Sequence, residues 1–274
     1  MPAVYAHKRF GERVFEFLPI PLQQAFARYK DCFMLGLEGP DVLFYHRPFK
    51  SNETRKRARK IHYASAKNFF VSAAEKIYAQ DVETPENTAL AAYTAGFICH
   101  FTLDNACHPR VYDLEDTGVS HGRIESEFDK YVLRREGNQV FGKNHAKHFK
   151  TSKEVISACA TIIDAKESEI LRAVKTLKFI NGAFACRYVF VHKLAHALLK
   201  KLNMEKLYGG MLFHHEDEKG CVTINEDLYN DLEQAIPLAV QTVNEFFTNL
   251  KTTAQTGAID NIFDKDYRGG RIHE

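Results

Sequence analysis

Two pairs of potential metal ligands, each spaced four residues apart, constrain most strongly how this chain folds. His100 and Asp104 form the first pair, and His121 and Glu125 form the second, with His108 between them. Four residues of α-helix turn about 400°, so the members of each pair point the same way, one turn apart. One such pair is common on a solvated helix face, whereas two pairs so close together favour a metal site. Nitrogen and oxygen donors in this arrangement suit zinc or a similar divalent ion.

Helical periodicity extends over most of the chain. Apolar residues recur at helical spacing over 7–18, 21–35, 52–78, 85–108, from 121 to a polar loop near 137–150, and over 152–177, 182–203 and 226–251. No segment alternates like a strand between hairpin turns, and no repeat of 20–50 residues is present. The sequence therefore predicts an all-α, multi-helix bundle. We expect one domain over 1–274, with metal ligands in 1–130, a helical C-terminal part at 150–255 and a flexible tail at 256–274.

The ends of several helices carry recognisable signals. Asn52 or the serine before it is expected to cap the helix over 52–78, and Ser120 to cap the helix that carries His121. Pro85 is expected at the first position of a helix, and Pro109 is expected to end that helix.

Composition excludes some classes of protein. The chain has 37 basic and 35 acidic residues and 45% hydrophobic residues, which is typical of a soluble protein with no obligatory nucleic-acid or membrane partner. No apolar run approaches the roughly 18–20 residues that span a bilayer. No GxSxG, P-loop or GxGxxG motif is present, which argues against several reaction classes.

The N-terminal residues and the cysteines predict a cytoplasmic protein. The first residues contain no long apolar segment and no small-residue cleavage site, so we expect no secretory signal. No CxxC pair occurs, and most cysteines lie in apolar helical context, as expected of reduced core thiols. The cysteines are Cys32, Cys99, Cys107, Cys159, Cys186 and Cys221.

Three further candidate ligands lie upstream. His7 is next to the first predicted helix, Asp41 lies in a loop rich in Gly and Pro, and His62 lies on the helix predicted over 52–78. Each also has an ordinary explanation: a terminal residue, a turn residue and a histidine at a polar boundary.

In order along the chain, these residues resemble the bacterial zinc-dependent phospholipase C family, which is related to fungal single-strand nucleases. The motif match covers roughly residues 1–130, and its most specific part is AYTAGFICHFTLDNACHP followed by HGRIESEFD. The later run FHHEDEKGCVTINEDLYNDLEQA also resembles the C-terminal segment of bacterial members, without ligand motifs.

The resemblance implies an all-helical fold that holds two zinc ions and a third site. It implies a first zinc site of Asp41, His62, His100 and Asp104, a second of His108, His121 and Glu125, and a third of His7 with a bridging Asp104. Secreted members also use an N-terminal tryptophan as a ligand and enclose a choline head group with an acid and aromatic residues. This chain has no tryptophan, Val42 follows Asp41, and Arg59 stands where an apolar contact is expected. Phosphatidylcholine specificity is therefore not implied.

Such a cluster suits phosphoester hydrolysis. Divalent cations neutralise charge that develops on the phosphoryl oxygens and lower the pKa of water from 15.7 to about 7. We expect Asp41 to act as the base as well as a ligand. The basic run from Arg55 to Lys60 is usually a solvated helix face, but Arg55 and Arg59 lie on neighbouring turns and could bind an anionic substrate.

The sequence thus favours a metal-dependent phosphoester hydrolase resembling phospholipase C, with a phosphoester substrate such as a phospholipid head group. A nuclease or nucleotidase on the same fold is the first alternative, with Phe44, Tyr45 and Tyr63 as candidates for base stacking. A protein that binds a metal or ligand without catalysis is the second alternative.

Overall fold

The computed structural model describes residues 4–80, 82–184, 187–201 and 213–270. In these ranges the chain is helical and contains no β-strand, which confirms the all-α prediction. The elements are α1 (Val4–Phe17), α2 (Ile20–Arg28), α3 (Lys30–Gly36), the 3₁₀ helix η1 (Gly39–Tyr45), α4 (Glu53–Tyr63), α5 (Lys67–Tyr78), α6 (Ala89–Glu115), α7 (His121–Arg135), α8 (Lys153–Ile163), α9 (Glu167–Phe184), α10 (Val189–Lys201), α12 (Lys219–Thr248), α13 (Leu250–Thr256) and the 3₁₀ helix η3 (Asn261–Asp264). None of these helices is long and apolar enough to cross a membrane.

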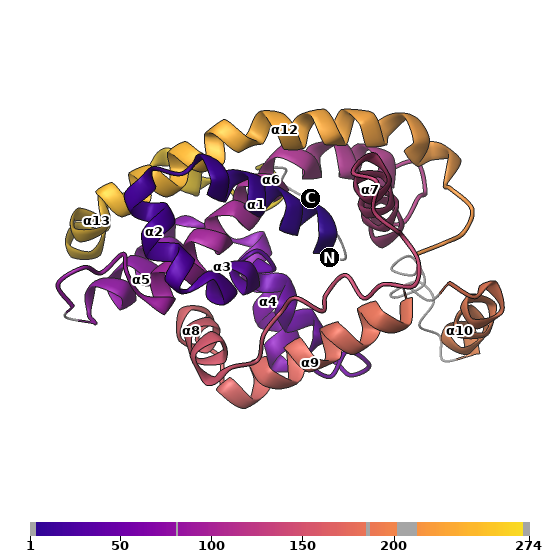
Figure 1. Cartoon of the computed structure of the whole chain (residues 1–274), viewed down its shortest axis with the longest axis horizontal. Helices are drawn as coiled ribbons and strands as arrows, with labels where there is room; N and C mark the ends of the chain where they lie inside the picture. Colours follow the sequence, from indigo (N-terminus) through magenta and orange to yellow (C-terminus); the bar gives the residue numbers. More distant parts are fainter. Residues whose placement is uncertain (1–3, 81, 185–186, 202–212, 271–274) are drawn as a thin grey trace.

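Helix α6 occupies the centre of the molecule, and the long helix α12 packs along it (Figure 1). Helices α1, α3, α7 and α8 also pack on α6. From Ala91 to Asp104 every side chain of α6 is buried, as expected of a helix that is apolar on nearly all sides. His100 and Asp104 therefore lie in the interior, where an unpaired charge is costly.

Several predicted helices are interrupted. The helix expected over 52–78 is two helices, α4 and α5, because the backbone turns away after Tyr63 and the N–H of Ala66 donates to the carbonyl of Lys265 at 2.9 Å. The helix expected over 21–35 breaks at Tyr29 into α2 and α3. The helical region expected over 152–177 is divided into α8 and α9. Asp164, directly after α8, has a left-handed conformation (φ 58°).

Other boundaries also differ from prediction. The side chain of Asn52 accepts from the N–H of Arg55, as a cap should, but α6 begins after a Thr88 cap rather than at Pro85. Helix α6 also continues through Pro109 to Glu115. The last long helix begins at Lys219, earlier than expected, and α13 follows it. Residues 202–203 of the predicted 182–203 helix, and Cys186, lie outside the described residues.

Part of the tail predicted to be flexible over 256–274 packs against the core. Phe263 and Tyr267 are fully buried, and their rings pack against Phe70 and Phe101, with ring centroids 4.6 Å apart for Phe70–Phe263 and 5.0 Å for Phe101–Tyr267. Burial of these two large aromatic side chains favours this packing, because each removes much apolar surface from water. Residues 271–274 lie outside the described residues.

Candidate metal centre

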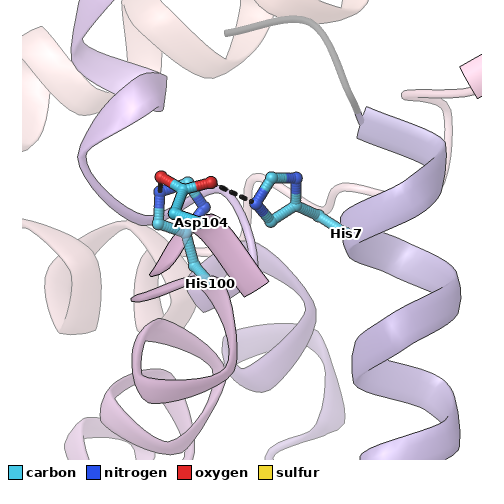
Figure 2. Close-up of side chains that lie close together, drawn as sticks. All are labelled: His7, His100 and Asp104. Atoms are coloured by element: carbon cyan, nitrogen blue, oxygen red, sulfur yellow. Dashed lines mark hydrogen bonds and ion pairs between the residues drawn. The ribbon is translucent and has the colours of Figure 1, made fainter. Parts of the chain in front are cut away.

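The Asp104 carboxylate lies between two imidazoles at the centre of the fold. His100 precedes it by one turn of α6, and His7 reaches it from α1 (Figure 2). Asp104 Oδ1 lies 3.2 Å from His7 Nε2, and Asp104 Oδ2 lies 3.2 Å from His100 Nε2. All three side chains are buried. These three residues form one group whose ligand atoms could share a cation.

Helix α1 is positioned for this contact by α7. The Asp129 carboxylate accepts hydrogen bonds from the N–H groups of Tyr5 (3.0 Å) and Ala6 (2.8 Å), which belong to the first turn of α1. The next residue is His7. Asp129 was missed at the sequence level, although it continues the four-residue spacing from Glu125 in HGRIESEFD.

A second group joins Asp41, His62 and His100. Asp41 lies in the first turn of η1, and its Oδ1 is 2.9 Å from Nε2 of His62 on α4. Gly39 opens η1 with φ +49°, and a Cβ at this position would lie 2.3 Å from the His100 ring. Glycine is therefore required here, both for the backbone conformation and for the close approach of His100.

The third group contains His108 of α6 and the i,i+4 pair His121 and Glu125 of α7. Glu125 Oε1 lies 3.2 Å from His121 Nε2 and 3.7 Å from His108 Nε2. His108 Nδ1 also lies 3.9 Å from Asp104 Oδ2, which connects this group to the first. The three groups together contain the eight residues that the sequence marked as ligands.

Four of the histidines share one orientation. Nδ1 lies next to the carbonyl of Ala58 for His62 (2.8 Å), of Leu37 for His100 (3.1 Å) and of Tyr267 for His108 (2.6 Å), and next to the carboxylate of Glu115 for His121 (3.1 Å). A carbonyl can only accept, so Nδ1 carries the hydrogen in the first three. This leaves their Nε2 lone pairs for a cation, as in metal sites whose outer partners fix the tautomer.

The donor set fits zinc. His100 Nε2 and Asp104 Oδ2 are buried 3.2 Å from each other, but neither makes a hydrogen bond to a described residue, which is unusual unless a ligand is bound. The histidine Nε2 atoms and their neighbouring carboxylate oxygens lie 2.9–3.7 Å apart, whereas a tetrahedral zinc with bonds near 2.1 Å places its ligands about 3.4 Å apart. Burial alone would raise the pKa of Asp104, but the nearby histidines hold that pKa well below its usual range. The carboxylate is thus ionised, as a ligand must be.

A cavity of about 650 Å³ opens over the cluster. Four ligand residues line it, together with aromatic, acidic and basic side chains: Asp41, His62, His108, His121, Phe44, Tyr63, Tyr112, Glu115, Asp116, Arg59 and Arg268. Ligands to a metal here would therefore face a space large enough for a small substrate.

The two arginines predicted to bind substrate are placed differently. Arg59 is exposed and lines the cavity, with no ion pair to another described residue. Arg55 is buried and donates to the carbonyl of Pro48 at 2.7 Å, so its guanidinium supports the chain before α4 instead of lining the cavity. Because Arg55 and Arg59 lie one helical turn apart, the sequence alone does not show which of them lines the cavity.

Arg268 of the C-terminal tail also lines the cavity and was missed at the sequence level. Its guanidinium pairs with Asp266 at 2.6 Å and lies over the ring of Tyr63, 4.5 Å from the centroid. No local pattern in the tail signals this role, because the segment reaches the site only through tertiary packing.

A model of the family described as zinc dependent phospholipase C matches residues 6–175, more than half of the chain. The chain therefore belongs to the zinc dependent phospholipase C family, and it is a zinc-dependent phosphodiesterase. The family implies metal-dependent phosphoester hydrolysis, zinc as cofactor and a phospholipid substrate. Comparison with curated proteins and with solved structures gives no significant match.

Proposed function

We propose that this protein hydrolyses phospholipids at the phosphodiester bond, with zinc held by the eight residues of the three groups. One observation carries the proposal: the groups are linked through His100 and Asp104, and four of their members line a single cavity. We propose two occupied zinc sites and a third at His7. Bound zinc would supply a Lewis acid that neutralises the phosphoryl group and makes water more acidic.

Asp41 is proposed as the residue that accepts the proton of the attacking water. Its carboxylate lines the cavity, and its contact with His62 holds it in place. Burial alone would raise its pKa, but neighbouring groups, including His62 in contact with it, lower the pKa below the usual range. Asp41 is therefore ionised at neutral pH, which both a metal ligand and a proton acceptor require.

Arg59 is proposed to contact the phosphate of the substrate. It is exposed, lines the cavity and lies one helical turn before Tyr63, so its charge faces the same space as the metal ligands. Arg268 lies beside Tyr63, where it adds positive potential that Asp266 partly neutralises. A phosphate between metals and arginine forms charge-assisted hydrogen bonds, which are stronger than neutral ones.

A panel of substrates tests this proposal. Zinc-loaded protein should release diacylglycerol and a phosphorylated head group from short-chain phospholipids, detected by phosphorus NMR. Nuclease activity is the second candidate, because Phe44, Tyr63 and Tyr112 line the cavity and could stack on a base. Faster turnover of dinucleotides would favour that candidate, and full zinc loading without any turnover would favour a binding protein.

A cytoplasmic location and a single domain stay predictions from the sequence. Cell fractionation with an antibody to the full chain tests the first. Limited proteolysis of the zinc-loaded protein tests the second, since one domain should resist cleavage between residues 130 and 150.

A further inference from the structure

The segment from Ile170 to Lys201 has a charge balance unlike that of the whole chain. It contains seven basic residues and no acidic residue, whereas the chain has 37 basic and 35 acidic residues. The seven are Arg172, Lys175, Lys178, Arg187, Lys193, Lys200 and Lys201. Most of this segment lies beyond residue 175, where the family match ends. It covers most of α9 and all of α10, and the basic residues of α10, Lys193, Lys200 and Lys201, are exposed.

Helix α10 also exposes large apolar side chains. Phe190 and Leu194, one turn apart, are each 69% exposed, and Tyr188 and Val189 at its start are also exposed. The opposite side of the helix faces the protein, where His192 is buried and its ring lies 4.9 Å from that of His215. Figure 1 shows α10 at the edge of the molecule, away from α6 and α12.

Lysines lie beside this apolar face. Lys193 is next to Leu194, and Lys200 and Lys201 form the last turn, and all three are exposed. An exposed apolar stripe with lysines along its side is the pattern of a helix that lies in the plane of a membrane interface. Its apolar side chains enter the acyl boundary, and the lysines contact anionic head groups, with each basic residue worth about fivefold in binding.

We propose that α10, with the basic residues of the Ile170–Lys201 segment, docks the protein on the surface of an anionic phospholipid bilayer. The charge and the exposed side chains carry this inference. Only its purpose, bringing the cavity to lipid substrate, rests on the proposed function.

Two other occupants fit the surface less well. A second copy of the chain on the same face would bring like-charged lysines together, which opposes association. A nucleic acid would match the charge but would leave the aliphatic Leu194 and Val189 without a partner, since bases stack on aromatic or planar groups.

Vesicle co-sedimentation tests the proposal with the zinc-loaded protein. Wild-type protein should bind vesicles of phosphatidylcholine with about 30% phosphatidylglycerol at least tenfold more tightly than pure phosphatidylcholine, because several lysines contribute. The double variant Phe190→Ser, Leu194→Ser should bind the anionic vesicles at least tenfold more weakly, since two large apolar side chains no longer enter the lipid. The triple variant Lys193→Gln, Lys200→Gln, Lys201→Gln should bind the two vesicle types more equally.

Matched controls separate docking from folding and from catalysis. Phe17→Ser removes an aromatic side chain that is 59% exposed on α1, and it should leave vesicle binding unchanged. All variants should keep the wild-type melting temperature and the wild-type turnover of a water-soluble phosphodiester. If the cavity is inactive, binding still distinguishes the variants, so failure of the proposed function and failure of this inference are separate results.

Three results would overturn the proposal. The first is equal binding of wild-type protein and the double serine variant to anionic vesicles. The second is loss of self-association in that variant, measured by sedimentation, with vesicle binding retained. The third is tighter binding of wild-type protein to RNA than to anionic vesicles, with the same dependence on the three lysines.

Discussion

The main-chain carbonyl of Tyr267 accepts a hydrogen bond from Nδ1 of His108 at 2.6 Å, so the C-terminal tail orients a candidate metal ligand on α6. The tail is held there by Gly269, which has φ +75° and lies against α6. A Cβ on Gly269 would lie 2.7 Å from Cγ of Pro109 and 3.1 Å from the carbonyl oxygen of Asn105. A cyclic side chain and a backbone carbonyl cannot move aside as a flexible side chain can.

Gly269→Ala should therefore weaken zinc binding, whereas Gly270→Ala should not. Gly270 has a similar φ of +79° but nothing within 4 Å of its Cβ position. Both variants lose about 1 kcal/mol from the backbone conformation. Only Gly269→Ala displaces the carbonyl that orients His108, and loss of such an outer partner lowers metal affinity about 10- to 100-fold. Competition with a chromogenic chelator measures this, and equal affinities would contradict the role of the tail.

Gly39→Ala should disrupt the centre from the opposite side. The added Cβ would overlap the His100 ring, so we expect a lower melting temperature and less bound zinc. Gly137→Ala is the matched control, because Gly137 has φ +69° with nothing within 4 Å. If both variants bind zinc with wild-type affinity, the close approach of Gly39 does not fix the position of the His100 ring.

Stability of the metal-free protein should fall as the pH rises from about 5 to about 9. Burial raises the pKa of Glu38 to about 8 and that of Asp129 to about 7, so the folded chain keeps protons that the unfolded chain has lost. Burial opposes the charge of His121, but Glu125 and Glu115 raise its pKa to about 9. The stability contributed by protonated His121 is therefore fully present below about pH 6.5 and is lost as the pH rises through about 9.

Zinc should reverse this trend, because its ligands bind without their protons. The rise in melting temperature on adding zinc should grow between about pH 5.5 and 8.5, as measured by scanning calorimetry with and without the metal. A zinc effect that is constant across this range would show that these groups do not titrate in competition with the metal.

Asp41→Asn should reduce turnover of a phosphodiester by about 100-fold or more, the usual scale for a general base. The amide keeps the shape of the side chain but cannot accept the proton. Asp116→Asn, which changes another carboxyl group that lines the cavity, should have a much smaller effect. Zinc content must be measured for both variants. Near-normal turnover of Asp41→Asn at full zinc content would remove Asp41 from the chemistry.

The sequence predicts the residues of the centre better than it predicts their surroundings. His100–Asp104 and His121–Glu125 follow directly from helical geometry, since four residues make about one turn. Asp41 lies far from these pairs along the chain, and no local period connects it to them, so only the family resemblance points to it. Its position beside the cluster depends on how η1 packs on α9 and α4.

What the sequence does not predict depends on contacts between distant segments. The chain breaks after Tyr63 because Ala66 bonds to Lys265 of the tail, and Arg268 reaches the cavity by the same packing. Arg55 and Arg59 differ in environment although they lie one turn apart on one helix. Helical periodicity alone cannot predict these contacts, because it does not show which other segment packs on each face of a helix.

The most direct test of a zinc phosphodiesterase is to measure zinc content and phospholipid turnover together in the purified full chain. We expect about two to three zinc ions per chain: one in each of the three groups of ligands, or one in each group except that of His7. Turnover should disappear when a chelator removes the zinc and return when zinc is restored. Full turnover of the metal-free protein, or a purified protein that binds no zinc at micromolar concentration, would contradict this expectation.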